Sequence, residues 1–144
     1  MRVDFYQLGE LPVEGVLPAL TAKMREAGPK VLIVSDDDAQ LAKISEALWA
    51  PKRTFLAHGL ASGPIDARQP ILLSKTLDAA NDARFLALTD GQWRSGAEKF
   101  ERVFLLFGDA TIDHARATWR SLDAVEGIER NYWRLEGKGW VQAA

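Results

Sequence analysis

Two arginines and a tryptophan recur at helical spacing in the segment ARATWRSL. In a helix ending near residue 122, Trp119 falls on the apolar stripe, and Arg116 and Arg120 lie side by side on its flank, one turn apart. Guanidinium groups bind a carboxylate through two parallel hydrogen bonds, and an aromatic surface beside them suits an apolar terminal residue. The pattern therefore predicts a site for a peptide with a free carboxylate. The same spacing also fits a core tryptophan flanked by two solvated arginines, and spacing alone does not exclude that interpretation.

A second group of aromatic residues lies in the segment ALWAPKRTFLAHGL. Leu48 continues the apolar face of the preceding helix, whereas Trp49 lies about 100° away from it around the helix axis. Pro51 ends the helix and directs the chain away from it. Trp49, Pro51 and Phe55 are therefore predicted to form an outward apolar ledge for a partner. A tryptophan packed under its own loop fits the pattern equally well.

Three consecutive aspartates, Asp36–Asp38, follow a buried apolar run. They could hold Mg²⁺, because carboxylate oxygens are its preferred ligands. They also suit the first turn of a helix, where carboxylates favour the positive end of the helix dipole. No second carboxylate follows the run PILLSK, so we favour the helix cap and expect no metal or other cofactor. His58 and His114 stand at no recognisable spacing from a nucleophile, and glycine-rich phosphate motifs are absent from the sequence.

Apolar runs alternate with amphipathic segments along the chain. The runs predict strands at residues 3–8, 30–35, 71–74, 84–89 and 103–107, with a further edge strand within residues 131–141. Helices are predicted over residues 11–27 and 36–49 and up to about residue 122. This alternation indicates one α/β domain over residues 1–144, Rossmann-like, with a mostly parallel central sheet and helices on both faces. In such a sheet, ligands bind beyond the carboxyl ends of the strands, and we expect Arg116 and Trp119 there.

Composition narrows the class of protein further. The formal net charge of −2 offers no basic excess, so strong direct binding to nucleic acid is not expected. The chain has no cysteine, which excludes disulfides and thiolate metal sites and fits a reducing cytoplasm. The first residues have no apolar signal-peptide core, and no apolar run approaches the ~18 residues that span a membrane. We therefore expect a cytoplasmic protein that does not enter membranes.

Several segments together resemble the chi subunit family of bacterial DNA polymerase III. They are VDFYQL, KVLIVSDDDAQLAKISEALWA and TFLAHGL and, more loosely, RVFLLF followed by ARATWRSL. The block from Glu46 to His58 is the most specific part, and the order of elements matches along nearly the whole chain. The resemblance implies a non-catalytic adaptor in the replisome that holds the acidic C-terminal tail of single-stranded DNA-binding protein. It also implies a second partner, the psi subunit or a replacement for it.

The resemblance assigns roles to residues of this chain. Arg116, Trp119 and Arg120 match the tail-binding positions, with Phe107 as an apolar wall. Trp49 and Phe55 match the psi-facing positions, with Pro51 between them. One departure is a lysine of the family, which is replaced here by Ile112 or Asp113. Loss of this positive charge would weaken tail binding or leave more of the binding to Arg120.

Two other hypotheses belong to different classes of protein. One is a small α/β enzyme, or a phosphate- or metal-binding domain, that uses Asp36–Asp38. The other is a protein that binds single-stranded DNA directly through Arg and Trp; the lack of basic excess argues against it.

Overall fold

The computed structural model describes residues 1–50, 56–63, 65–137 and 139–144. The strands are β1 (Arg2–Gln7), β2 (Val31–Val34), β3 (His58–Leu60), β4 (Ile71–Ser74), β5 (Phe85–Leu88), β6 (Arg102–Phe107), β7 (Glu129–Glu136) and β8 (Gly139–Gln142). The helices are α1 (Val13–Glu26), α2 (Asp38–Trp49) and α3 (Ile112–Asp123), with short 3₁₀ turns at Asp66–Arg68, Ala97–Lys99 and Asp109–Thr111. None of the helices in the described ranges is long and apolar enough to cross a membrane.

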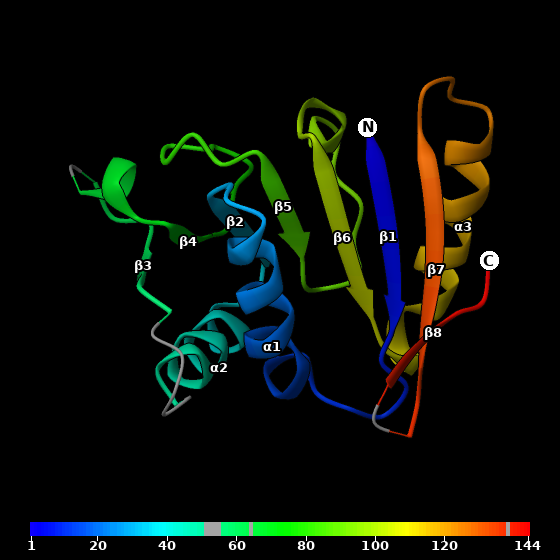
Figure 1. Cartoon of the computed structure of the whole chain (residues 1–144), viewed down its shortest axis with the longest axis horizontal. Helices are drawn as coiled ribbons and strands as arrows, with labels where there is room; N and C mark the ends of the chain where they lie inside the picture. The colour runs from blue at the N-terminus through cyan, green and yellow to red at the C-terminus, as the bar shows by residue number, and fades with distance from the viewer. Residues whose placement is uncertain (51–55, 64, 138) are drawn as a thin grey trace.

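The strands described form one mixed sheet in the order β3-β4-β2-β5-β6-β1-β7-β8. All neighbouring strands are parallel except β8, which runs antiparallel to β7. Figure 1 shows α1 and α2 on the near side of the sheet and α3 on the far side, behind β7. The prediction of an α/β fold with a mostly parallel sheet and helices on both faces is therefore confirmed.

Side-chain alternation along the strands builds a separate apolar core on each face of the sheet. On β1, Tyr6 packs in the core beneath α1 and α2, and its neighbour Phe5 packs in the core beneath α3. The central strands β2, β4 and β5 are buried along their whole length. Both faces are covered there, which explains the continuous apolar runs in the sequence.

The end of the sheet after α3 differs from the prediction. A single edge strand was expected within residues 131–141, whereas the chain there forms a hairpin, in which β7 pairs with β1 and only β8 lies at the edge. The three-residue strand β3 was not predicted, because a run this short with a central glycine carries no periodic signal. The pairing of β7 with the distant strand β1 has no local signal in the sequence either.

A buried carboxylate joins the middle of the sheet to β7. Asp4 is fully buried, and its oxygens accept hydrogen bonds from Arg102 Nε at 2.7 Å, from Arg2 Nε at 3.2 Å and from the indole nitrogen of Trp133 at 3.0 Å. A buried charge needs such partners, since its desolvation is otherwise uncompensated. Asp4 thereby fixes β1 against β6 and β7, the strands that position α3 and the segment after β8.

The Tyr6 phenol, which lies near this carboxylate, makes the stability of the fold depend on pH in the alkaline range. Burial, reinforced by the negative charge of Asp4, raises the pKa of Tyr6 from 10.0 to about 12. The folded state therefore keeps this proton to a higher pH than the unfolded chain does. We expect a stabilising contribution of about 2–3 kcal/mol that is complete below pH 10 and is lost as the pH rises toward 12.

Denaturant unfolding at pH 9 and at pH 11.5, on the wild type and on Tyr6→Phe, measures this contribution. The wild type should lose stability over this range by more than Tyr6→Phe does. Equal losses in the two proteins would contradict the assignment.

Candidate functional site

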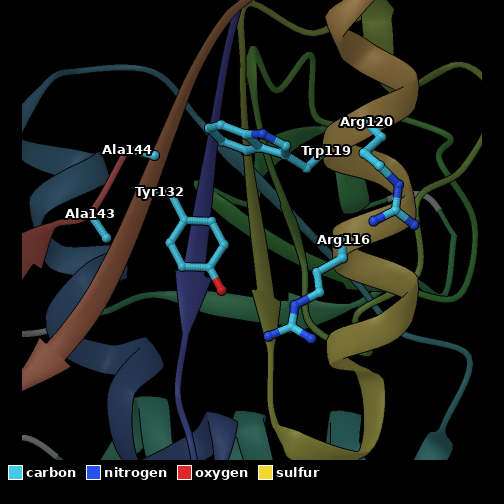
Figure 2. Close-up of a pocket in the computed structure, with 6 residues that line it drawn as sticks. All are labelled: Arg116, Trp119, Arg120, Tyr132, Ala143 and Ala144. Atoms are coloured by element: carbon cyan, nitrogen blue, oxygen red, sulfur yellow. The ribbon is translucent and has the colours of Figure 1, made fainter.

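A pocket of about 310 Å³, called the α3–β7 pocket below, lies between α3 and the β7–β8 end of the sheet. Its lining residues are Arg116, Trp119, Arg120, Tyr132, Ala143 and Ala144. Figure 2 shows the Trp119 ring extending from α3 over the sheet toward β7, with the Arg116 guanidinium on the same side of α3 as the Tyr132 hydroxyl. The three residues that spacing singled out thus line one pocket, together with three that it did not.

The position of α3 follows from the turn after β6. The backbone N–H of Gly108 donates to the Thr111 hydroxyl oxygen at 3.2 Å, and the 3₁₀ turn that ends at Thr111 leads directly into α3. Ala115 and Leu122 are buried against the sheet. Because Arg116 and Arg120 lie off this apolar stripe, both are exposed to solvent.

Trp119 is half-buried and is held by three neighbours. Its ring lies edge-on to Phe5 at 5.1 Å and to Tyr132 at 5.8 Å between centroids. The guanidinium of Arg130 lies 4.3 Å from the Trp119 ring centroid and donates to the Trp119 carbonyl oxygen at 2.6 Å. Aromatic edge contacts and a cation–π contact each favour one ring orientation. Both interpretations of Trp119 are therefore partly met, since the ring packs on the core and also lines the pocket.

Tyr132 forms the wall opposite α3. Its hydroxyl donates to the side-chain oxygen of Gln7 at 2.6 Å, and its backbone N–H donates to the carbonyl oxygen of Ala144 at 2.9 Å. Burial raises the pKa of Tyr132, while the positive charges of Arg116 and Arg134 act in the opposite direction. The phenol oxygen therefore lies within the field of two guanidinium groups.

Phe107, the expected apolar wall, lies behind this surface. It is 1% exposed, and its ring packs edge-on against Tyr132 at 5.7 Å between centroids. Phe107 supports the pocket through Tyr132, which lines the wall itself.

The pocket combines cationic and apolar groups. Within the described part of the chain, no acidic side chain forms an ion pair with Arg116 or Arg120. Their guanidinium groups remain available to an external carboxylate, and the Trp119 and Tyr132 rings and two alanines offer an apolar surface beside them. The arrangement can bind an anion with an attached apolar group.

The crevice beyond the carboxyl ends of the strands is a separate hollow. The prediction that Arg116 and Trp119 lie there is wrong, because they line the α3–β7 pocket. The crevice has five acidic lining residues, which are Glu10, Glu14, Asp37, Asp90 and Asp109. This lining repels phosphate, which a Rossmann-like crevice commonly binds.

The three aspartates after β2 occupy three different environments. The Asp37 carboxylate accepts from the backbone N–H groups of Ala39 and Gln40 and caps α2. The favoured interpretation is therefore confirmed for Asp37 and for Asp38 in the first turn, whereas Asp36 lies before the helix, which begins two residues later than predicted. Asp36 pairs with Arg94 at 3.3 Å, and Asp38 pairs with Lys75 at 3.4 Å. In the ranges that the structure describes, no group of three or more metal-ligating side chains is gathered as a metal site would need.

The second predicted surface is described only in part. Trp49 ends α2 and is 55% exposed, and its ring lies 4.3 Å from the His58 ring between centroids. His58 itself is held by Ser45 Oγ at 2.9 Å and by the Leu56 carbonyl oxygen at 2.8 Å. Pro51 and Phe55 lie outside the described residues. Trp49 is thus partly exposed to solvent at the end of α2 and also packs against His58.

The sheet order and the helices on its two faces define a Rossmann-like α/β protein. A family model described as DNA polymerase III chi subunit, HolC, matches residues 1–129 of the chain. This chain therefore belongs to the chi subunit family of DNA polymerase III, and its membership supports a role in DNA replication. No curated protein matches the chain at a significant level. The match includes Trp49 and all of α3 and ends before Tyr132.

Proposed function

We propose that this protein is a non-catalytic adaptor that links the DNA polymerase III assembly to the C-terminal tail of single-stranded DNA-binding protein. The observation that carries the proposal is the α3–β7 pocket, in which two exposed arginines without an acidic partner among the described residues flank an aromatic surface. The tail-binding positions of the chi family match Arg116, Trp119 and Arg120, and these three residues come together in that pocket.

The small volume of the pocket favours the end of a peptide over a larger cofactor. Its volume of about 310 Å³ is at the low end of the range of small-molecule sites, which is about 300–1,000 Å³. A terminal phenylalanine ring would contact Trp119 and Tyr132, and its α-carboxylate would receive hydrogen bonds from Arg116 and Arg120. Because both arginines are exposed, the affinity should be modest and should fall as the salt concentration rises.

A separate surface around Trp49 would bind the second partner, the psi subunit or a protein that replaces it. An aromatic side chain that is 55% exposed at a helix end is a typical anchor of a protein interface. Trp49 is on α2 and the pocket is beside α3, and these helices cover opposite faces of the sheet (Figure 1). The two partners could therefore bind at the same time, as an adaptor requires.

Titration of the protein into a fluorescent acidic peptide that ends in Asp-Phe tests the proposal. A matched peptide without the final Phe is the control. We expect saturable binding of the complete peptide and no measurable binding of the shortened one. Equal affinity for both peptides, or no binding of either, would contradict the proposed function.

A further inference from the structure

Arg130 of β7 is a third arginine beside α3, and neither the sequence pattern nor the family resemblance assigns it a role. Its guanidinium carbon lies over the Trp119 ring, 4.3 Å from the ring centroid. The guanidinium also donates to the Trp119 carbonyl oxygen at 2.6 Å and pairs with the Asp123 carboxylate at 2.7 Å. One side chain of β7 is therefore joined to the Trp119 ring, to the Trp119 backbone and to the end of α3.

The guanidinium of Arg130 lies outside the α3–β7 pocket. Trp119 and Tyr132 line that pocket, whereas Arg130 is not among its lining residues. Figure 2 shows Tyr132 and the Arg116 guanidinium together on one side of the Trp119 ring. Arg130 precedes Tyr132 by two residues on the same face of β7, so its side chain reaches the ring from the other side. The indole thus lies between Arg130 and the pocket.

The position of Arg130 matters for a ligand that carries a carboxylate. The face of an aromatic ring has a negative potential, which attracts cations and repels anions. A carboxylate bound by Arg116 and Arg120 would lie close to the Trp119 ring, because all three side chains line the same pocket. A guanidinium on the opposite side of the ring offsets this repulsion, and its contact with the ring also fixes the orientation of the indole.

On the basis of the proposed tail-binding function, we propose that Arg130 is a positioning residue of the α3–β7 pocket. It holds the Trp119 indole where the ring receives the apolar terminal residue of a bound peptide, and its charge lowers the repulsion between the ring and the terminal carboxylate. Arg130 acts through Trp119 and does not contact the peptide.

The ion pair with Asp123 is separate from the contact that positions the ring. The Asp123 side chain is 73% exposed, whereas that of Arg130 is 19% exposed. An ion pair with so exposed a carboxylate contributes little, so the stack on Trp119 and the bond to its carbonyl oxygen should hold the guanidinium without it. Asp123→Asn is therefore a matched control, since it removes the negative charge and leaves both contacts with Trp119 in place.

The test titrates the wild type, Arg130→Gln, Arg130→Lys and Asp123→Asn with an acidic peptide whose last residue is Phe with a free carboxylate. Arg130→Gln should weaken binding by about three- to tenfold, the size of one cation–π contact. Arg130→Lys should recover part of this loss, because an ammonium keeps the charge over the ring but not the planar stack. Asp123→Asn should bind within about twofold of the wild type.

The indole ¹H–¹⁵N resonance of Trp119 distinguishes positioning of the ring from a general loss of stability. In Arg130→Gln this resonance should shift before any peptide is added, while thermal melts show that the variant is folded. An unshifted Trp119 resonance in Arg130→Gln, or equal losses of affinity in Arg130→Gln and Asp123→Asn, would overturn the role of Arg130.

Failure of this role and failure of the proposed function give different results. If the wild type binds the peptide and Arg130→Gln binds it as tightly, the role of Arg130 is overturned and the tail-binding function stands. If the wild type does not bind the peptide, the tail-binding function fails and the role of Arg130 fails with it.

Discussion

Replacing Arg116 with alanine should lower the affinity for the Asp-Phe tail peptide by about 10- to 100-fold, the range expected for losing hydrogen bonds between charged groups. Arg116 lies beside the Tyr132 hydroxyl in the pocket, and its guanidinium has no acidic partner in the described part of the chain (Figure 2). Because the side chain is exposed, its removal should change the free energy of unfolding by no more than about 0.5 kcal/mol. Fluorescence anisotropy and thermal melts measure the two quantities separately.

Two further variants make this result specific to the pocket. Arg116→Lys keeps the charge but loses the paired hydrogen-bond geometry, so its affinity should lie between those of the wild type and Arg116→Ala. Trp49→Ala alters the surface on α2 and should leave tail binding unchanged, while it weakens binding of the second partner. A folded Arg116→Ala protein with wild-type tail affinity would show that the tail does not bind in this pocket.

The largest effect on stability is expected at Asp4. Its carboxylate is fully buried and accepts hydrogen bonds from Arg2, Arg102 and Trp133. Asp4→Ala leaves these donors without their acceptor, and we expect a loss of about 2–4 kcal/mol in the free energy of unfolding. The lower part of that range allows for solvent reaching the two arginines, which are 37% and 26% exposed.

A surface ion pair in the same protein is the matched control for Asp4. Glu101 pairs with Arg84 at 3.2 Å, and both side chains are more than half exposed. Glu101→Ala should cost no more than about 1 kcal/mol. Urea unfolding of both variants makes the comparison, and an Asp4→Ala loss as small as that of Glu101→Ala would show that the buried carboxylate is not a structural centre.

The parts of the fold that could be predicted are those whose signal is local in the sequence. The runs KVLIVS and RVFLLF are continuous because the strands that they form are covered on both faces, and continuity marks such strands. The positions of Arg116, Trp119 and Arg120 on α3 follow from helical periodicity in the same way. Local spacing therefore yields the α3 side of the pocket.

The opposite wall could not be found from spacing, because distant pairing creates it. Tyr132 faces the pocket because β7 pairs with β1, and its hydroxyl partner Gln7 is 125 residues earlier in the chain. Ala143 and Ala144 have no distinctive side-chain chemistry, and they line the pocket only because hydrogen bonds join this segment to Tyr132. From the sequence alone, a tyrosine in a strand is expected to be an ordinary core residue.

In the proposed function, a free C-terminal carboxylate with its apolar residue binds between Trp119 and Tyr132. The most direct measurement follows the indole ¹H–¹⁵N resonances of the five tryptophans while the Asp-Phe peptide is added, with Trp119→Phe used to assign the resonance of Trp119. We expect the Trp119 resonance to shift and saturate, the Trp49 resonance to stay in place, and a peptide with an amidated C-terminus to have little effect. Movement of Trp49 without Trp119, or an equal response to the amidated peptide, would contradict the proposed function.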